Sequence, residues 1–96
     1  MLDFDWDESK STANKRKHGV SFDEAQTVFF DDDALEYSDP DHSDEESRFL
    51  LLGRSIRLRL LIVCHCFRRS DAVIRIISAR KATPPERRAY SRRGKP

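Results

Sequence analysis

The residues best suited to chemistry in this chain are one histidine and two arginines in its second half, His65, Arg75 and Arg80. A histidine side chain gives or takes a proton near neutral pH. An arginine guanidinium holds phosphate oxygens with two parallel hydrogen bonds and offsets the charge that develops on phosphorus. RNA carries its own nucleophile, the 2′-hydroxyl, so an acid/base group and cations suffice for its cleavage without a metal ion. These three residues therefore indicate phosphodiester chemistry.

Side chains alternate between the two faces of a strand, and this alternation is the basis for placing His65. One face of the predicted strand 58–67 is expected to be core: Leu58, Leu60, Ile62, Cys64 and Cys66. His65 then stands on the opposite, half-polar face. In the predicted strand 73–80 the core set is Ile74, Ile76 and Ser78, which puts Arg75 on the polar side with His65. A simpler alternative stays open, in which His65 is a solvated strand residue without a catalytic role.

No metal ion or other cofactor is expected. The segment Cys64-His-Cys66 has residue types that bind zinc, but alternation turns His65 away from both thiols and the sequence holds no second cysteine pair. The acidic stretch 39–46 has a proline at position 40 and lacks the glycine of a calcium loop, so a solvated loop is expected. The two cysteines are alternate residues of one strand, which predicts reduced thiols and no disulfide.

Charge is divided between the two halves of the chain. Residues 1–48 hold 15 acidic against 5 basic residues, a net charge of −10, and residues 49–96 hold 2 against 13, a net charge of +11. A basic half of this density attracts phosphate groups. Four basic residues are expected to guide RNA along the surface: Arg48, Lys81, Arg87 and Arg88. The basic run 15–18, which ends at His18, either touches phosphate or complements a helix dipole, and both alternatives stay open.

No apolar run approaches the roughly 18 residues that a membrane span requires, and the first residues are acidic where a secretion signal would be basic. The protein is therefore expected in the cytoplasm. Local signals predict a single small α+β domain over residues 1–96, with elements in the order β-α-α-β-β-β-β-α. Two N-terminal helices are expected to pack on an antiparallel meander sheet, followed by a C-terminal helix.

Capping signals set the predicted helix ends. Asp7 reads as the N-cap of a helix that runs to about His18 and stops at Gly19. Ser21-Phe-Asp-Glu24 is a capping box for a second helix that runs to about Phe30. Thr83 with Pro84 opens the last helix. The remaining predicted elements are strands at 3–6, 34–38, 48–54, 58–67 and 73–80.

Several stretches of the chain resemble the BrnT family of ribonuclease toxins, which have a RelE-like fold. The matching residues are Phe4-Asp-Trp-Asp-Glu8 with Lys10 and Asn14, Lys17-His-Gly-Val-Ser-Phe-Asp-Glu-Ala25, Arg48, Gly53, Leu60-Leu-Ile-Val63 with His65, Arg75-Ile-Ile-Ser-Ala-Arg-Lys-Ala82 and Glu86-Arg-Arg-Ala-Tyr90. Together they span residues 4–90. The resemblance implies metal-independent RNA cleavage that inhibits translation and growth. It also implies neutralisation by a BrnA-like antitoxin, as a dimer of toxin–antitoxin pairs, with operator DNA contacted only through the antitoxin.

Two functions remain as hypotheses. The first is an endoribonuclease toxin with His65 as general acid/base and with Arg75 and Arg80 as stabilisers of the transition state. The second is a non-catalytic module that binds nucleic acid or a partner with the same basic face. Such a module usually adds aromatic side chains for base stacking, and here Phe67 alone offers one. Growth arrest on induction, with a reading frame for a ribbon-helix-helix protein directly downstream, would favour the toxin.

Overall fold

The computed structural model describes residues 2–39 and 47–93 of the chain. Its elements are β1 (Asp3–Asp5), α1 (Glu8–His18), α2 (Phe22–Gln26), the 3-10 helix η1 (Thr27–Phe30), β2 (Leu35–Ser38), β3 (Phe49–Arg54), β4 (Leu60–Arg68), β5 (Val73–Lys81) and α3 (Pro84–Arg92). The predicted order of elements is confirmed. The predicted second helix is α2 continued by η1. Of the predicted loop 39–46, all but Asp39 lies outside the described residues.

The strands form one five-stranded sheet in the order β1-β5-β4-β3-β2. The pairs β2–β3, β3–β4 and β4–β5 are antiparallel, but β1 runs parallel to β5, with Asp3 opposite Val73. The prediction of a purely antiparallel meander is therefore wrong. The parallel pair joins segments some 70 positions apart in the sequence, and the turn signals that predict a meander report only on neighbouring strands.

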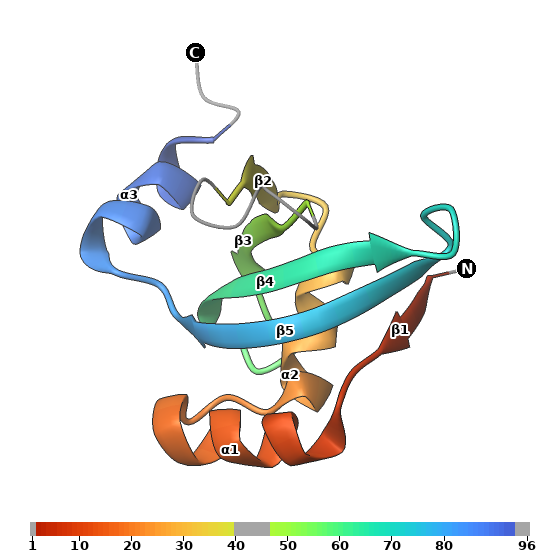
Figure 1. Cartoon of the computed structure of the whole chain (residues 1–96). Helices are drawn as coiled ribbons and strands as arrows, with labels where there is room; N and C mark the ends of the chain where they lie inside the picture. Colours follow the sequence, from red (N-terminus) through yellow and green to blue (C-terminus); the bar gives the residue numbers. More distant parts are fainter. Residues whose placement is uncertain (1, 40–46, 94–96) are drawn as a thin grey trace.

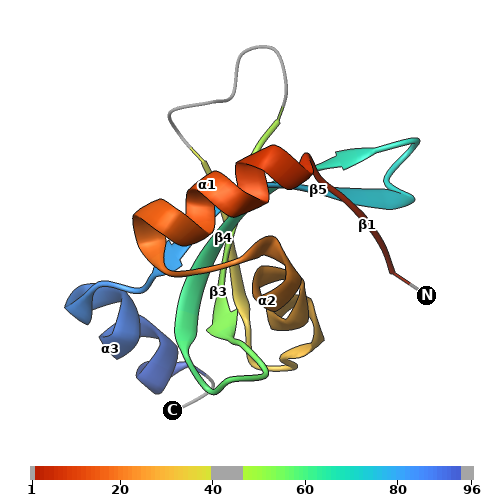
Figure 2. The same cartoon turned by 90° about the horizontal axis from the view of Figure 1, so that it is seen from below.

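Helices cover both faces of the sheet, so the central strands are buried on both sides. Figures 1 and 2 show α1 and α2 against one face and α3 beside the other, near one end of β3 and β4. The larger core lies under α1 and α2 and contains Phe22, Val28, Leu61 and Val63. The smaller core lies under α3 and consists of Leu52, Leu60, Ile62 and Tyr90. Since α1 itself buries only polar side chains, Ser11 and Asn14, polar contacts must hold it in place.

The predicted caps account for where the helices begin and end. The Asp7 carboxylate accepts from two amides of the first turn of α1, and Gly19 ends the helix with a left-handed φ of 74°. Thr83 and Glu86 form a full capping box at the start of α3. Gly53 allows η1 to approach β3 closely, since a Cβ there would lie 2.8 Å from Cγ1 of Val28.

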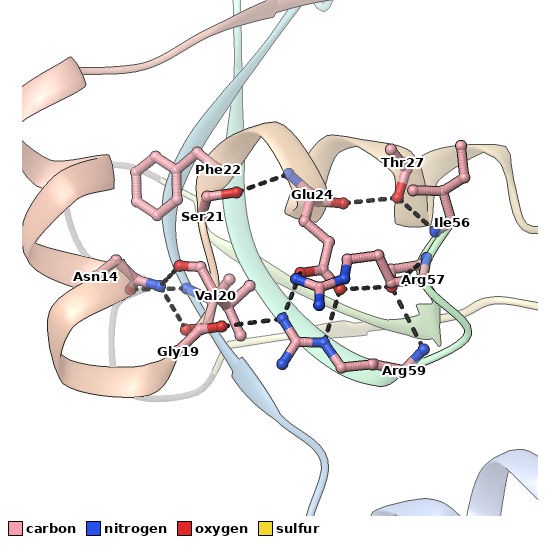
Figure 3. A network of polar contacts seen from close by, with 12 residues as sticks. Asn14, Gly19, Val20, Ser21, Phe22, Glu24, Thr27, Ile56, Arg57 and Arg59 are labelled. Carbon is pink, nitrogen blue, oxygen red and sulfur yellow. Dashed lines mark hydrogen bonds and ion pairs between the residues drawn. The ribbon is translucent and has the colours of Figure 1, made fainter.

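The buried amide of Asn14 joins α1 to β5. Its Nδ2 donates to the carbonyls of Val20 at 2.7 Å and Ala79 at 2.8 Å, and its Oδ1 accepts from the Ala79 amide at 3.2 Å. Figure 3 shows this side chain beside the turn that ends α1. Because β1 pairs with β5 only from Val73 to Arg75, Asn14 takes the place that a neighbouring strand would occupy at Ala79.

We predict that Asn14→Ala lowers the free energy of unfolding by about 2–4 kcal/mol, because it leaves buried backbone groups of Val20 and Ala79 unpaired. Urea unfolding at neutral pH measures the change. Thr12→Ala, an exposed substitution on the same helix, is the matched control and should stay within about 0.5 kcal/mol of the wild type. Equal stability of the two variants would show that the Asn14 contacts are not needed to hold α1.

Candidate functional site

A hollow of about 180 Å³ lies on the sheet face that also carries α3. Its lining joins α1, β3, β4 and β5: His18, Asp39, Arg48, Leu50, Ile62, Cys64, Ile77, Ser78, Ala79 and Arg80. It therefore brings an imidazole, two guanidinium groups and a hydroxyl to one place. Cations and a titratable ring around a solvent-open hollow are what binding and cleavage of a phosphodiester require.

A β-bulge in β5 decides which side chains reach this hollow. His65 pairs with Ile76 and Cys64 pairs with Ser78, so Ile77 has no partner of its own in the ladder. The bulge reverses the alternation of β5. Ile74 and Ile76 are buried before it, but beyond it Ala79 is buried and Ser78 is exposed. The face predicted for Ser78 is therefore wrong, and the reversal turns Ser78 and Arg80 toward the hollow.

His18 reaches the hollow because α1 is fixed against β5. It is the last residue of α1, one helical turn after Asn14, and Asn14 bonds to Ala79 between the two site residues Ser78 and Arg80. His18 was not among the catalytic residues predicted from the sequence. Its position at the end of the basic run 15–18 could have identified it, because phosphate contact was one of the two interpretations left open for that run.

Arg80 is held by Glu86 at the start of α3. Its Nη1 and Nη2 donate to the two carboxylate oxygens at 2.8 and 2.9 Å, and Nη1 also donates to the Lys81 carbonyl at 3.2 Å. Glu86 in turn accepts from the Thr83 amide at 2.8 Å. A guanidinium has five N–H donors, so this arrangement fixes Arg80 and leaves donors for a phosphate oxygen. Arg80 bonding to Glu86 lowers the pKa of that carboxyl to about 2.

Cys64 lies at the base of the hollow as a neutral thiol. Its Sγ donates toward Oδ2 of Asp39 at 3.8 Å. Burial raises the pKa of the Cys64 thiol, and the negative charge of Asp39 adds to this effect, although Arg48 and Ser78 act against it. Since a neutral thiol is a weak nucleophile, Cys64 is unsuited to covalent catalysis. Neither Cys64 nor Cys66 forms a disulfide, as the sequence predicts.

His65 does not lie on a half-polar face, and that prediction is wrong. Its side chain is 0% exposed. The ring nitrogen Nδ1 lies 3.0 Å from the Val63 carbonyl and Nε2 lies 3.3 Å from Oε1 of Glu36, so protein groups engage both nitrogens. The rings of Phe29 and Phe67 contact it edge-on. His65 points to the face of the sheet opposite that of Cys64. The helices α2 and η1 cover this face, and His65 is part of the core beneath them.

The predicted grouping of His65 with Arg75 is also wrong. Arg75 pairs with Cys66, one residue beyond His65, so the two side chains point to opposite faces of the sheet. Arg75 shares the face of the hollow but lies outside its lining, and its Nη1 donates to Asp5 at 2.8 Å.

Of the four residues expected to guide RNA, Arg48 alone lines the hollow. Lys81 is exposed and pairs with Leu61, which points its side chain to the face away from Arg80. Arg87 and Arg88 are exposed on α3. The basic residues therefore spread over both faces of the sheet, and the hollow gathers Arg48 from the first half of the chain and Arg80 from the second.

Within residues 2–39 and 47–93 no group of three or more histidine, cysteine or acidic side chains lies together as a metal site would require. No helix in the same ranges is long and apolar enough to cross a membrane.

The chain is similar to a known protein family and to solved structures. Residues 6–86 match the family model described as ribonuclease toxin, BrnT, of type II toxin–antitoxin system. The fold is similar to the crystal structure of the Brucella abortus ribonuclease toxin BrnT, with a TM-score of 0.64 and 22% sequence identity. The similarity covers 86% of this chain and 99% of the other. The comparison with curated proteins gave no match.

The low pKa of Glu86 predicts a pH dependence of stability. Its pKa falls from an ordinary value of 4.5 to about 2 in the folded chain, so its contribution is fully present above pH 4.5 and is lost as the pH falls through about 2. Thermal unfolding of the wild type and of Glu86→Gln measures this contribution. We expect the wild type to be more stable at pH 6 and the difference to shrink between pH 4.5 and pH 2. A difference that does not change with pH would contradict the ion pair.

Proposed function

Because this chain belongs to the BrnT family of ribonuclease toxins of type II toxin–antitoxin systems, we propose that it is an endoribonuclease whose active site is the hollow lined by His18, Arg48 and Arg80. The observation that carries this proposal is the convergence of these three side chains with the exposed Ser78 in one open hollow. We propose further that residues 1–96 form one toxin domain, and that cleavage inhibits translation and growth.

In the proposed reaction the RNA 2′-hydroxyl attacks the adjacent phosphorus. A base removes the hydroxyl proton, the bond from phosphorus to the 5′-oxygen breaks, and an acid protonates the departing 5′-oxygen. The products are a 2′,3′-cyclic phosphate and a 5′-hydroxyl end. Arg80 and Arg48 are proposed to neutralise the charge that develops on the phosphate oxygens. Ser78 is proposed to donate a hydrogen bond to one of these oxygens.

His18 is proposed as the general acid/base in place of His65. A histidine side chain can give and take a proton in catalysis, and His18 is half-buried in the lining of the hollow. His65 is fully buried with both ring nitrogens engaged, so we propose for it a structural role between β4 and the edge strand β2. Arg75, Lys81, Arg87 and Arg88 are proposed to hold RNA outside the reacting phosphate.

The proposed mechanism requires no metal ion or other cofactor, since the protein supplies the proton transfer and the positive charge. A BrnA-like antitoxin is the proposed partner, in a dimer of toxin–antitoxin pairs that binds operator DNA through the antitoxin. An acidic, partly apolar antitoxin segment would cover the cations of the hollow most directly.

We predict that His18→Gln lowers the rate of RNA cleavage by about 100-fold or more without lowering the melting temperature. Cleavage of a labelled RNA at saturating protein measures the rate. The control is Lys17→Gln, which removes a neighbouring charge outside the hollow and should keep nearly the full rate. Equal rates for the two variants would show that His18 transfers no proton.

Cleavage in excess EDTA is expected to proceed at nearly the untreated rate, because no step of the proposed reaction passes through a metal. The measurement compares initial rates of the dialysed protein with and without the chelator. Loss of cleavage in EDTA, with recovery on addition of magnesium or zinc, would overturn this mechanism.

A further inference from the structure

The turn between β3 and β4 exposes apolar side chains at a position where stability alone would favour polar ones. Among the described residues, the three most exposed large apolar side chains are Leu58 at 78%, Ile56 at 76% and Phe30 at 66%. Phe30 and Ile56 line one hollow of about 430 Å³, together with Thr27, Asp31, Arg54 and Ser55. Leu58 lies two residues beyond Ile56 in the same turn. Exposed apolar groups that share one hollow are typical of a protein-binding surface.

The backbone of this turn is strained as well. Leu58 adopts a left-handed φ of 64°, a conformation that glycine, asparagine or aspartate adopts more easily than leucine. Closure of the turn accounts for this conformation, since the Leu58 amide donates to the Ser55 carbonyl at 2.8 Å and the Ser55 amide donates to the Arg59 carbonyl at 2.9 Å. Leucine in place of glycine therefore keeps an exposed apolar side chain at a cost in backbone strain.

Polar contacts make the turn rigid before any partner arrives. The Thr27 hydroxyl accepts from the Ile56 amide at 2.9 Å, and the Ser55 hydroxyl donates to Oε2 of Glu24 at 2.7 Å. Arg59 donates through Nε to the same oxygen at 2.9 Å and through Nη2 to the Gly19 carbonyl at 2.9 Å. Figure 3 shows these contacts, which join the turn to α2 and to the end of α1. A preorganised surface loses little entropy on binding.

The charge around the turn defines the partner that it fits. Two cations flank Ile56: the exposed Arg54, and Arg57, whose side chain is 68% exposed. The nearest carboxylates are engaged within the protein. That of Glu24 lies 3.9 Å from Arg57 and is only 5% exposed, and that of Asp31 accepts from the Arg54 amide and the Tyr90 hydroxyl. A segment with apolar anchors for Phe30, Ile56 and Leu58, and with acidic residues beside them, complements this surface. The family is one of toxins of type II toxin–antitoxin systems, so an antitoxin is the partner to which this chemistry is assigned.

We propose that the surface formed by Phe30, Arg54, Ile56, Arg57 and Leu58, the β3–β4 turn surface, is a docking site for an apolar, acidic segment of the antitoxin. This inference rests on the proposed function for the existence of the partner, but its location is separate from the hollow of His18 and Arg80. Neither Ile56 nor Leu58 lines that hollow. The antitoxin would thus have an anchor whose loss releases the toxin without damaging catalysis.

The test compares Ile56→Asp and Leu58→Gly with the wild type. The probe is the proposed partner, a BrnA-like antitoxin, and its affinity for each purified variant is measured by titration. The matched control is Leu2→Asp, a 45% exposed apolar residue beside β1, at the opposite end of the sheet. RNA cleavage by each variant without the probe is measured in parallel.

We expect both turn variants to bind the probe at least about tenfold more weakly than the wild type, with cleavage unchanged, and Leu2→Asp to bind normally. Leu58→Gly should also raise the melting temperature of the unbound protein, because it relieves the strain at φ 64°. A residue with only a structural role would lose stability when it is replaced. A gain in stability together with a loss of affinity would therefore show that Leu58 serves docking.

Wild-type affinity in both variants would overturn the docking site. Concentration-dependent self-association of the wild type that Ile56→Asp abolishes would also overturn it, because a second copy of the chain would then occupy this surface. Absence of RNA cleavage in the wild type, with binding still lost in the variants, would overturn the proposed function and support the docking site.

Discussion

The contact between Asn14 and Ala79 is the constraint on which the site depends most. One buried amide satisfies the two backbone groups of Ala79 that no strand covers, and it bonds to Val20 beyond the end of α1. Without it α1 would have little reason to lie against β5, because the helix buries no apolar side chain. Since His18 follows Asn14 by one turn and Ala79 lies between Ser78 and Arg80, this one contact brings the residues of the hollow together.

The second requirement is that acidic residues hold the arginine side chains in place by ion pairs. Arg80 is paired with Glu86, Arg59 with Glu24 and Arg75 with Asp5, so acidic partners position these three arginines. The Glu86 pair also joins the end of β5 to the capping box of α3. The same carboxylate thus orients a site cation and starts the helix that covers the smaller core, which couples the geometry of the hollow to the stability of the fold.

Local signals were enough to predict most of the fold. The caps at Asp7, Ser21 and Thr83 and the stop at Gly19 depend on the chemistry of a few adjacent residues, and all are present. The capping box predicted for Ser21 is only half formed, because the Glu24 carboxylate accepts from Ser55 and Arg59 instead. The position of His65 was not predictable in this way, because alternation cannot identify the exposed face of a strand that is buried on both sides. The bulge at Ile77 reversed the alternation of β5, and no residue type signals it in the sequence. The pairing of β1 with β5 is a contact between the two ends of the chain, which local patterns do not report.

The central claim is that RNA reacts on the face of the sheet that carries the hollow, and not on the face of His65. The most direct measurement is an NMR titration of the protein with a short RNA in which one 2′-deoxynucleotide blocks cleavage. We expect the largest shifts at the amides of Ser78, Ala79 and Arg80 and at the imidazole of His18, with His65 unchanged. Shifts centred on His65, Phe29 and Phe67 would contradict it, since those residues lie on the opposite face.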